Sequence, residues 1–185
     1  LFEDNAEYGF GMRLAVDSNR GQLKARVEEL LEKGTSGELT AALKKNLDLW
    51  KSVGRDAKDA AEKTRELLPA ALKNATTETK PIIAKIMELG DYFVDKSVWI
   101  FGGDGWAYDI GYGGLDHVMA QQKNVNVLVL DTEVYSNTGG QSSKATPRGA
   151  IAKFAADGKK TGKKNLGLMM TTYGHVYVAS VNMAQ

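Results

Sequence analysis

Two short apolar segments, each followed by a loop rich in small and polar residues, constrain the fold of this chain most strongly. The first segment, 97–101, runs straight into Gly-Gly-Asp-Gly at 102–105. The second, 125–130, runs into a long loop with two glycines and many hydroxyl groups. Thr132 in that loop comes 28 residues after Asp104, about the length of one strand-helix-strand unit. We therefore expect both loops to emerge at the same edge of a parallel sheet.

The residues of these loops suit an anion and a divalent cation. Gly103 and Gly105 allow the backbone to approach a bulky anion closely. The first turn of a helix after them offers unpaired N–H groups to phosphate. Asp104 stands where Mg²⁺ would bridge its carboxylate to phosphate oxygens. The sequence thus predicts one metal ion and one diphosphate held between two loops.

Two longer strings narrow this prediction. They are Gly-Gly-Asp-Gly-Trp-Ala-Tyr-Asp-Ile-Gly-Tyr-Gly-Gly-Leu-Asp at 102–116 and Asp-Thr-Glu-Val-Tyr-Ser-Asn-Thr-Gly-Gly-Gln-Ser-Ser-Lys-Ala-Thr-Pro at 131–147. An acidic residue inside Gly-Asp-Gly, followed one crossover later by a second metal-binding loop, resembles the thiamine diphosphate motif. The full strings resemble the pyruvate:ferredoxin (flavodoxin) oxidoreductases, in the domain that holds the cofactor diphosphate. The resemblance covers residues 97–181 closely and residues 1–12 more weakly.

The resemblance implies a role for individual loop residues. Asp104, the hydroxyl of Thr132 and the carbonyl of Val134 would ligate Mg²⁺. Asn137 would be the catalytic residue, hydrogen-bonding the substrate or a developing oxyanion. The residues implied to contact thiamine diphosphate are Gly103, Asp104, Gly105, Trp106, Thr132, Glu133, Val134, Tyr135, Ser136 and Asn137.

Simpler structural roles for some of these residues stay open. Asp104 suits a helix N-cap, Thr132 a turn or strand-end hydroxyl, and Asn137 a turn. Trp106 suits an ordinary core aromatic.

The resemblance also implies an activity for a larger parent enzyme. That enzyme would oxidatively decarboxylate pyruvate to acetyl-CoA and CO₂, using coenzyme A, and pass electrons through 4Fe-4S clusters to ferredoxin or flavodoxin. This chain has no cysteine and so ligates no cluster. The chain begins without Met, and we expect a fragment of a cytoplasmic, homodimeric enzyme whose remaining domains supply the clusters. We expect the fragment alone to be inactive.

The expected fold class is α/β, a mostly parallel sheet flanked by helices, with an inserted helical segment. We expect a helical N-terminal part and insertion over residues 1–92, and a thiamine diphosphate- and Mg²⁺-binding core over residues 93–185. Leu39, Leu43, Leu47 and Trp50, for example, fall at helical spacing. The predicted helices are 4–33, 37–52, 56–74, 81–93, 109–122, 146–156 and 163–173, and the predicted strands are 98–101, 125–130 and 176–181.

Two other interpretations remain open. A Rossmann-type dinucleotide site would explain the strand–glycine–helix start, with Asp131 as the ribose-binding acid. Its third glycine is missing, however, because position 108 is Tyr. The other interpretation is a non-catalytic interaction module, in which a helical segment is fused to a degenerate α/β domain.

Charge and composition exclude further classes. The net charge of +1 favours neither nucleic acid nor an acidic membrane surface as a partner, and no apolar stretch is long enough to span a bilayer. His117 and His175 have no neighbours at the spacing of a catalytic triad or a zinc site. The basic run 159–164 is expected to be solvated, with contact to an acidic electron carrier or coenzyme A as the weaker alternative.

Overall fold

The computed structural model describes residues 5–182, which fall into two compact units. Residues 14–96 form one unit, and the described residues of the other are 5–13 and 97–182. Helix α1 (Ala6–Lys33) contributes to both units. The division at residue 92 that we predicted from the sequence stays a prediction.

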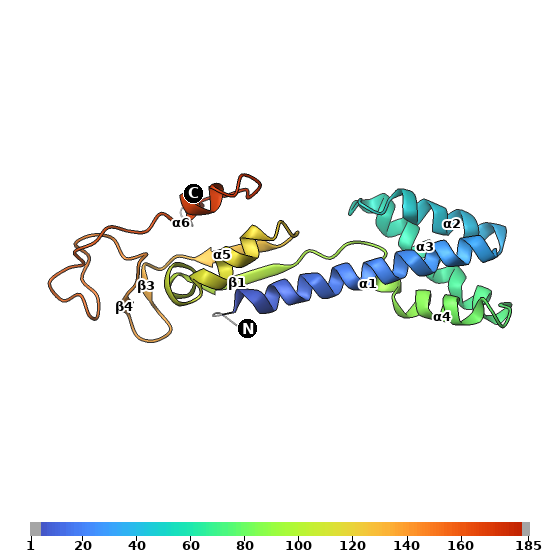
Figure 1. Ribbon diagram of the computed structural model, residues 1–185, viewed down its shortest axis with the longest axis horizontal. Coiled ribbons are helices and arrows are strands. Elements are labelled where there is room, and N and C mark those ends of the chain that lie inside the picture. The colour runs from blue at the N-terminus through green and yellow to red at the C-terminus, as the bar shows by residue number, and fades with distance from the viewer. Residues whose placement is uncertain (1–4, 183–185) are drawn as a thin grey trace. The chain divides into compact units, whose positions relative to one another are not determined.

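The unit of residues 14–96 is entirely helical (Figure 1). After α1 it holds α2 (Gly37–Asp48), α3 (Arg55–Lys73), α4 (Lys80–Glu88) and a short 3₁₀ helix, η1 (Gly90–Tyr92). Apolar residues of these helices form one core, in which the predicted positions Leu39 and Leu43 are buried and Leu47 and Trp50 are partly buried. Its buried members are Leu23, Val27, Leu30, Leu39, Leu43, Ala61, Leu68, Ile82, Ile83, Ile86, Leu89 and Phe93.

Local signals set the helix boundaries in this unit. Gly34 has a φ of +86°, the left-handed conformation in which helices commonly end. Ser36 caps α2, its hydroxyl accepting a hydrogen bond from the Leu39 N–H. Pro81 lies in the first turn of α4, where a missing N–H costs nothing.

The buried Asn46 amide donates to the Thr64 hydroxyl at 2.7 Å and thereby ties α2 to α3.

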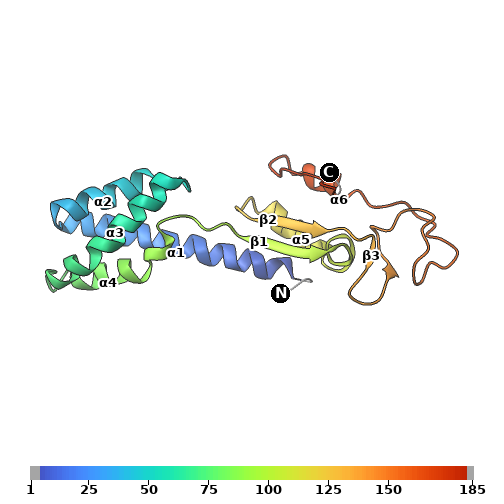
Figure 2. The same ribbon diagram turned by 180° about the vertical axis from the view of Figure 1, so that it is seen from behind.

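The second unit contains the parallel sheet. Strand β1 (Trp99–Gly103) pairs in parallel with β2 (Asn126–Leu130), from Trp99 opposite Asn126 to Gly103 opposite Leu130. The crossover between them consists of η2 (Gly105–Ile110) and α5 (Tyr112–Ala120). Figure 2 shows both strands running in the same direction toward η2. The prediction of a strand-helix-strand unit is therefore confirmed.

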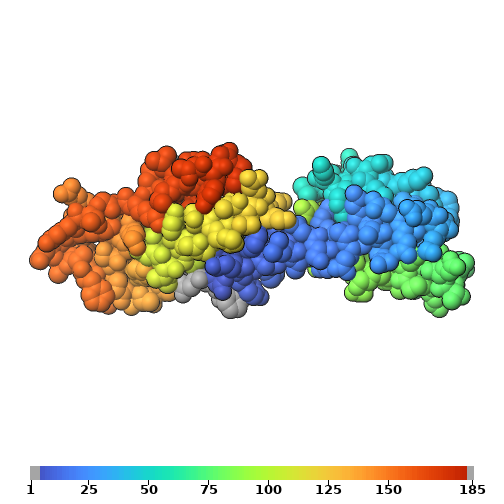
Figure 3. All heavy atoms as spheres, viewed as in Figure 1, coloured from blue at the N-terminus to red at the C-terminus, as the bar shows by residue number. Residues whose placement is uncertain are grey.

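The rest of this unit extends from the carboxyl end of β2. A short antiparallel hairpin, β3 (Val134–Tyr135) and β4 (Gln141–Ser142), is followed by an irregular segment and α6 (Leu166–Thr171). The segment 171–175 that follows α6 lies beside α5 (Figure 3). There the Tyr173 hydroxyl donates to Asp116 and the His175 ring contacts the Met119 carbonyl. The buried core residues are Ala6, Ile100, Trp106, Ala107, Tyr108, Leu115, Val118, Ala145, Leu166 and Met170.

The crossover begins earlier than predicted, with a π-helical turn rather than a loop. The Trp106 carbonyl accepts from the N–H of Gly111, five residues on, at 2.8 Å. The indole of Trp106 packs so closely on Gly102 and Gly111 that a Cβ at either position would lie within 2.2 Å of the ring. The wide turn therefore accommodates a bulky, buried aromatic side chain directly after the Gly-Asp-Gly sequence.

The helix predicted over 146–156 is wrong. Thr146, expected to cap it, instead donates its hydroxyl to the carbonyl of Glu133. Gly149 and Phe154 have φ values of +84° and +65°, which a right-handed helix does not permit. The backbone pairs across the loop, with the Gly149 N–H donating to the carbonyl of Lys159 at 2.8 Å.

The strand predicted over 176–181 is also wrong. Residues 174–182 have no regular structure among the described residues, and the side chains of Tyr177 and Val181 are 90% and 84% exposed. A strand needs a neighbour for its backbone hydrogen bonds, and none of the described strands pairs with this segment. The chain is thus an α/β protein with a two-stranded parallel sheet.

No helix in the described range 5–182 has the length and apolar character to cross a membrane.

Candidate functional site

The carboxyl ends of β1 and β2 bring the two predicted loops together. Gly103 pairs with Leu130, so Asp104 and Asp131 begin the two loops side by side at one edge of the sheet. Both strands leave the core in the same direction because the connection between them is a parallel crossover. The predicted juxtaposition of the two loops is confirmed.

Asp104 is the centre of this arrangement. Its side chain is buried, with the residue only 1% exposed, and both carboxylate oxygens accept hydrogen bonds from the second loop. Oδ1 accepts from the backbone N–H of Thr132 at 3.2 Å and from its hydroxyl at 2.9 Å. Oδ2 accepts from the hydroxyl of Ser143 at 2.7 Å. A buried carboxylate is costly unless it is satisfied in this way.

Three oxygens of different kinds converge at this point. The Thr132 hydroxyl lies 2.9 Å from a carboxylate oxygen of Asp104 and 3.2 Å from the carbonyl oxygen of Val134. A hydroxyl has one proton and donates it to only one acceptor at a time. Adjacent ligands of an octahedral Mg²⁺, at about 2.1 Å from the metal, lie about 3 Å apart. The chemistry and spacing of these oxygens therefore fit a magnesium ion.

The second loop turns sharply between its two expected ligands. Glu133 has a φ of +66°, the left-handed region that non-glycine residues adopt rarely. The Glu133 N–H donates to a carboxylate oxygen of Asp131 at 3.2 Å, as in an Asx turn. This turn directs the Val134 carbonyl back toward the hydroxyl of Thr132. The strained residue thus separates the two oxygen donors of this loop.

The glycines on either side of Asp104 have different surroundings. A Cβ on Gly105 would lie 2.4 Å from the ring of Tyr135, so this glycine permits the two loops to pack together. A Cβ on Gly103 would meet no atom within 4 Å, which leaves open space beside the backbone at the end of β1. The indole nitrogen of Trp106 is buried and has no hydrogen-bond partner among the described residues.

The other predicted residues lie farther along the second loop. Tyr135 is half-buried in β3, and Ser136 and Asn137 are exposed in the turn between β3 and β4. Gly140 closes that turn by donating its N–H to the Tyr135 carbonyl at 2.8 Å. The location of Asn137 is compatible with both roles weighed from the sequence, a turn residue and a substrate contact.

Sequence reasoning missed three residues of this site, namely Ser143, Tyr108 and Lys163. Ser143 was only one of several hydroxyls in the loop, yet its buried side chain contacts Asp104. Asp131 accepts from the Tyr108 hydroxyl at 2.9 Å and pairs with Lys163 at 2.7 Å. Burial, and next the hydrogen bond to Asp131, raise the pKa of Tyr108 far above its ordinary value. The basic run that contains Lys163 was expected to be solvated, and residues 160–163 are indeed exposed, but Lys163 also pairs with the second loop.

The contacts of the two histidines indicate structural roles. The ring of His117 meets that of Phe10 edge to face, and His175 contacts the backbone carbonyls of Tyr173 and Met119. The described residues hold no group of three or more His, Cys, Asp or Glu side chains placed to bind a metal. The proposed oxygen site needs only one carboxylate, because Mg²⁺ also accepts neutral oxygen ligands and phosphate.

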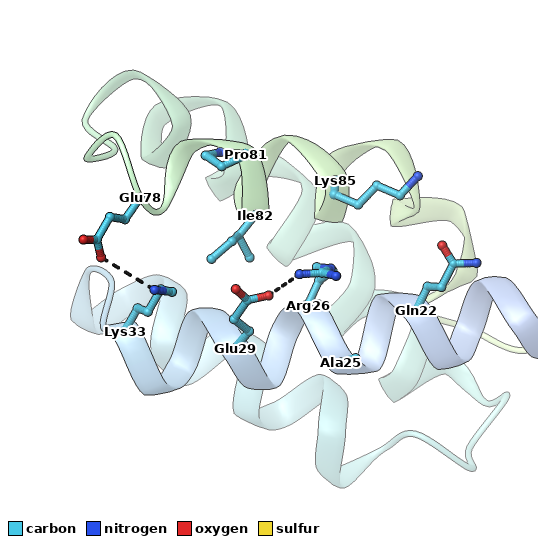
Figure 4. Close-up of a pocket in the computed structure, with 9 residues that line it drawn as sticks. All are labelled: Gln22, Ala25, Arg26, Glu29, Lys33, Glu78, Pro81, Ile82 and Lys85. Atoms are coloured by element: carbon cyan, nitrogen blue, oxygen red, sulfur yellow. Dashed lines mark hydrogen bonds and ion pairs between the residues drawn. The ribbon is translucent and has the colours of Figure 1, made fainter.

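The helical unit has a groove of its own, about 610 Å³ in volume, between α1 and α4 (Figure 4). Charged side chains at its rim pair with one another. Lys33 reaches Glu78 at 3.6 Å, and Arg26 pairs with Glu29 one turn along α1. Because these charges are paired, the groove has little net charge with which to attract a charged ligand. The helical segment is therefore better explained by a structural role than by ligand binding.

Comparison with known proteins identifies the family of this chain. Residues 84–185 match the family described as thiamine pyrophosphate enzyme, C-terminal TPP binding domain. The chain therefore belongs to this family of thiamine pyrophosphate-binding domains.

Its similarity to longer proteins covers almost the whole chain. It is 55% identical to the pyruvate:ferredoxin oxidoreductase of Moorella thermoacetica, over 99% of this chain and 16% of that protein. It is 51% and 50% identical to the pyruvate-flavodoxin oxidoreductases of Klebsiella pneumoniae and Trichormus variabilis, over 99% of this chain and 15% of each. The chain thus spans about a sixth of the length of these relatives.

Proposed function

We propose that this chain anchors the diphosphate of thiamine diphosphate through a magnesium ion held by Asp104, Thr132 and Val134. The convergence of these three oxygens at the carboxyl ends of two parallel strands carries the proposal. Membership of a thiamine pyrophosphate-binding family supplies the identity of the anion. The open space beside Gly103 supports a position for the diphosphate at the end of β1.

Each loop would contribute differently to binding. Asp104 would supply the charged metal ligand, and the Thr132 hydroxyl and Val134 carbonyl the neutral ones. Gly103, Gly105 and Trp106 would offer backbone N–H groups to the phosphate oxygens. The remaining proposed contacts with the cofactor are those of Glu133, Tyr135, Ser136 and Asn137. Asn137 would use its amide near the reacting carbonyl of the substrate.

The similar proteins support a wider proposal for the enzyme that contains this domain. Their names, pyruvate:ferredoxin and pyruvate-flavodoxin oxidoreductase, suit a 2-oxo acid oxidoreductase that oxidatively decarboxylates pyruvate to acetyl-CoA and CO₂. Bound thiamine diphosphate would supply the electron sink for this decarboxylation. Asp104 and the second loop would hold the diphosphate end fixed, so that the reactive end meets the substrate in one orientation.

Further features of this enzyme follow from the same proposal. Electrons would pass through 4Fe-4S clusters bound outside this cysteine-free chain to ferredoxin or flavodoxin. We also propose a cytoplasmic homodimer, in which the parallel sheet is larger than the two strands β1 and β2. The 185-residue chain alone should not decarboxylate pyruvate, and a pyruvate decarboxylation assay on the isolated chain tests that expectation.

Calorimetric titration of the full-length enzyme distinguishes this proposal from a dinucleotide site. We expect thiamine diphosphate to bind in the presence of Mg²⁺ and to bind far more weakly after the metal is chelated, whereas NAD should give no heat of binding. Binding of NAD without thiamine diphosphate would favour the Rossmann-type interpretation. Binding of neither ligand would favour a non-catalytic module.

A further inference from the structure

The basic run 159–164 folds back onto the proposed cofactor site. The Lys159 ammonium group donates to the carbonyl of Thr146 at 2.6 Å. Lys164 donates its backbone N–H to the Lys144 carbonyl at 2.9 Å and its ammonium group to the Tyr108 carbonyl at 3.0 Å. The ammonium of Lys164 also lies over the ring of Tyr112, 3.1 Å from its centroid. These contacts hold the two ends of the run, and the Lys164 N–H fixes the backbone next to Lys163.

Lys163 is directed at the second loop. Its ammonium group lies 2.7 Å from a carboxylate oxygen of Asp131 and 3.4 Å from one of Glu133. These two acids flank Thr132, the proposed hydroxyl ligand of the metal. One lysine therefore bridges the residues before and after this ligand, across the sharp turn at Glu133.

The Lys163 bridge also balances negative charge around the loop. Asp104, Asp131 and Glu133 place three carboxylates close to the proposed position of the diphosphate anion. The metal would offset the charge of Asp104 and part of the diphosphate, but Asp131 and Glu133 would still repel the anion. Lys163 is the cation paired with both of these acids. Its removal would leave two unbalanced negative charges beside the ligand.

We propose that Lys163 is a positioning residue for the diphosphate end of the cofactor, acting by holding Asp131 and Glu133 on either side of Thr132 and by balancing their charge. This inference rests on the function proposed above. Lys163 acts through the second loop, and the proposal does not require it to touch the substrate or the metal. Within the basic run Lys160 and Lys163 are exposed and Lys159 and Lys164 are half-buried, so Lys163 supports the site from its solvent-facing side.

The test compares neutral and charged substitutions in the full-length enzyme. Lys163→Met and Lys163→Gln remove the charge, Lys163→Arg keeps it, and Lys160→Met removes an exposed charge from the same run. Titration measures the dissociation constants of Mg²⁺-thiamine diphosphate and of Mg²⁺-pyrophosphate, the second probe reporting on the diphosphate end alone. We expect both neutral variants to weaken both ligands about tenfold or more, the range seen when groups behind metal ligands are removed. Lys163→Arg should restore most of the affinity, and Lys160→Met should change it less than twofold.

Hydrogen exchange without any ligand gives an independent readout. Amides 131–134 should exchange faster in the neutral Lys163 variants than in the wild type, and Lys160→Met should leave them unchanged. If the wild type binds neither probe, the function proposed for the domain fails. If the wild type binds but the neutral variants bind equally tightly, or if Lys160→Met weakens binding as much, the role of Lys163 is refuted.

Discussion

Thr132 donates both its backbone N–H and its side-chain hydroxyl to the same carboxylate oxygen of Asp104, at 3.2 and 2.9 Å. The two residues lie 28 positions apart in the chain and meet because β1 and β2 end at the same edge of the sheet. This contact places the oxygen of a hydroxyl beside that of a buried carboxylate. The proposed metal site requires both of these oxygens.

The hydroxyl of Thr132 is the first group to test. Thr132→Val keeps the shape of the side chain but removes the oxygen, and we expect Mg²⁺-dependent affinity for thiamine diphosphate to fall about tenfold to a hundredfold. Thr132→Ser keeps the oxygen and should bind within a few-fold of wild type. Calorimetric titration of the full-length enzyme measures both. Equal binding by the Val and Ser variants would show that the hydroxyl is not a ligand.

Ser143 holds the other carboxylate oxygen of Asp104. Ser143→Ala removes a buried hydroxyl that donates to Asp104 at 2.7 Å and accepts from the N–H of Ala145 at 3.0 Å. We expect the free energy of unfolding to fall by about 1–3 kcal/mol, because buried partners are left unsatisfied. Denaturant unfolding measures this loss, with Ser142→Ala at the adjacent position as the matched control. A loss no greater than that of the control would argue against the buried network.

The two glycines beside Asp104 should respond differently to an added methyl group. Gly105→Ala would place a Cβ 2.4 Å from the ring of Tyr135, and we expect a loss of about 1–3 kcal/mol in stability from this overlap. Gly103→Ala meets open space, so stability should change by less than about 1 kcal/mol while affinity for thiamine diphosphate falls. Thermal unfolding and titration on each variant separate the two effects. If Gly103→Ala binds the cofactor as tightly as the wild type does, the diphosphate does not lie beside Gly103.

The hydrogen bond of Tyr173 makes the stability of this unit depend on pH in the alkaline range. Its hydroxyl donates to Asp116 at 2.5 Å; that hydrogen bond, followed by burial and the carboxylate charge, raises the pKa of Tyr173 to about 12 from its ordinary value of 10.0. The folded state therefore favours the protonated phenol. The stabilisation is fully present below pH 10 and is lost as the pH rises from 10 through 12.

Comparison with Tyr173→Phe isolates this effect from the titration of other groups. We expect the wild type to be more stable than the variant up to pH 10, and the difference to shrink toward pH 12. Denaturant unfolding at several pH values measures it, with the exposed Tyr177→Phe as control. A difference that stays constant from pH 9 to pH 12 would contradict the assigned hydrogen bond.

Local patterns were enough to predict the framework of the site. The strand-loop spacing around Asp104 and Thr132 and the rule for parallel crossovers together placed the two loops at one edge. The apolar spacing of Leu39 and Leu43 likewise gave helix α2 and its buried face. These predictions rest on neighbours in sequence or on a single crossover, which is why sequence alone sufficed.

The failures at Thr146, Ser143 and Lys163 involve partners distant in the sequence. Thr146 looked like a helix cap, but its hydroxyl is engaged by the Glu133 carbonyl on another loop. Ser143 meets Asp104 across 39 residues, and Lys163 meets Glu133 across 30. A lysine in a basic run and a serine in a polar loop give no sign of such contacts until the fold places their partners nearby.

A crystal structure of the full-length enzyme grown with thiamine diphosphate and Mg²⁺ tests the central claim most directly. We predict one metal ion at about 2.0–2.2 Å from a carboxylate oxygen of Asp104, the hydroxyl of Thr132 and the carbonyl of Val134, with phosphate oxygens completing its coordination. A metal ion that binds the diphosphate without these three oxygens, or a diphosphate bound away from the ends of β1 and β2, would contradict the account.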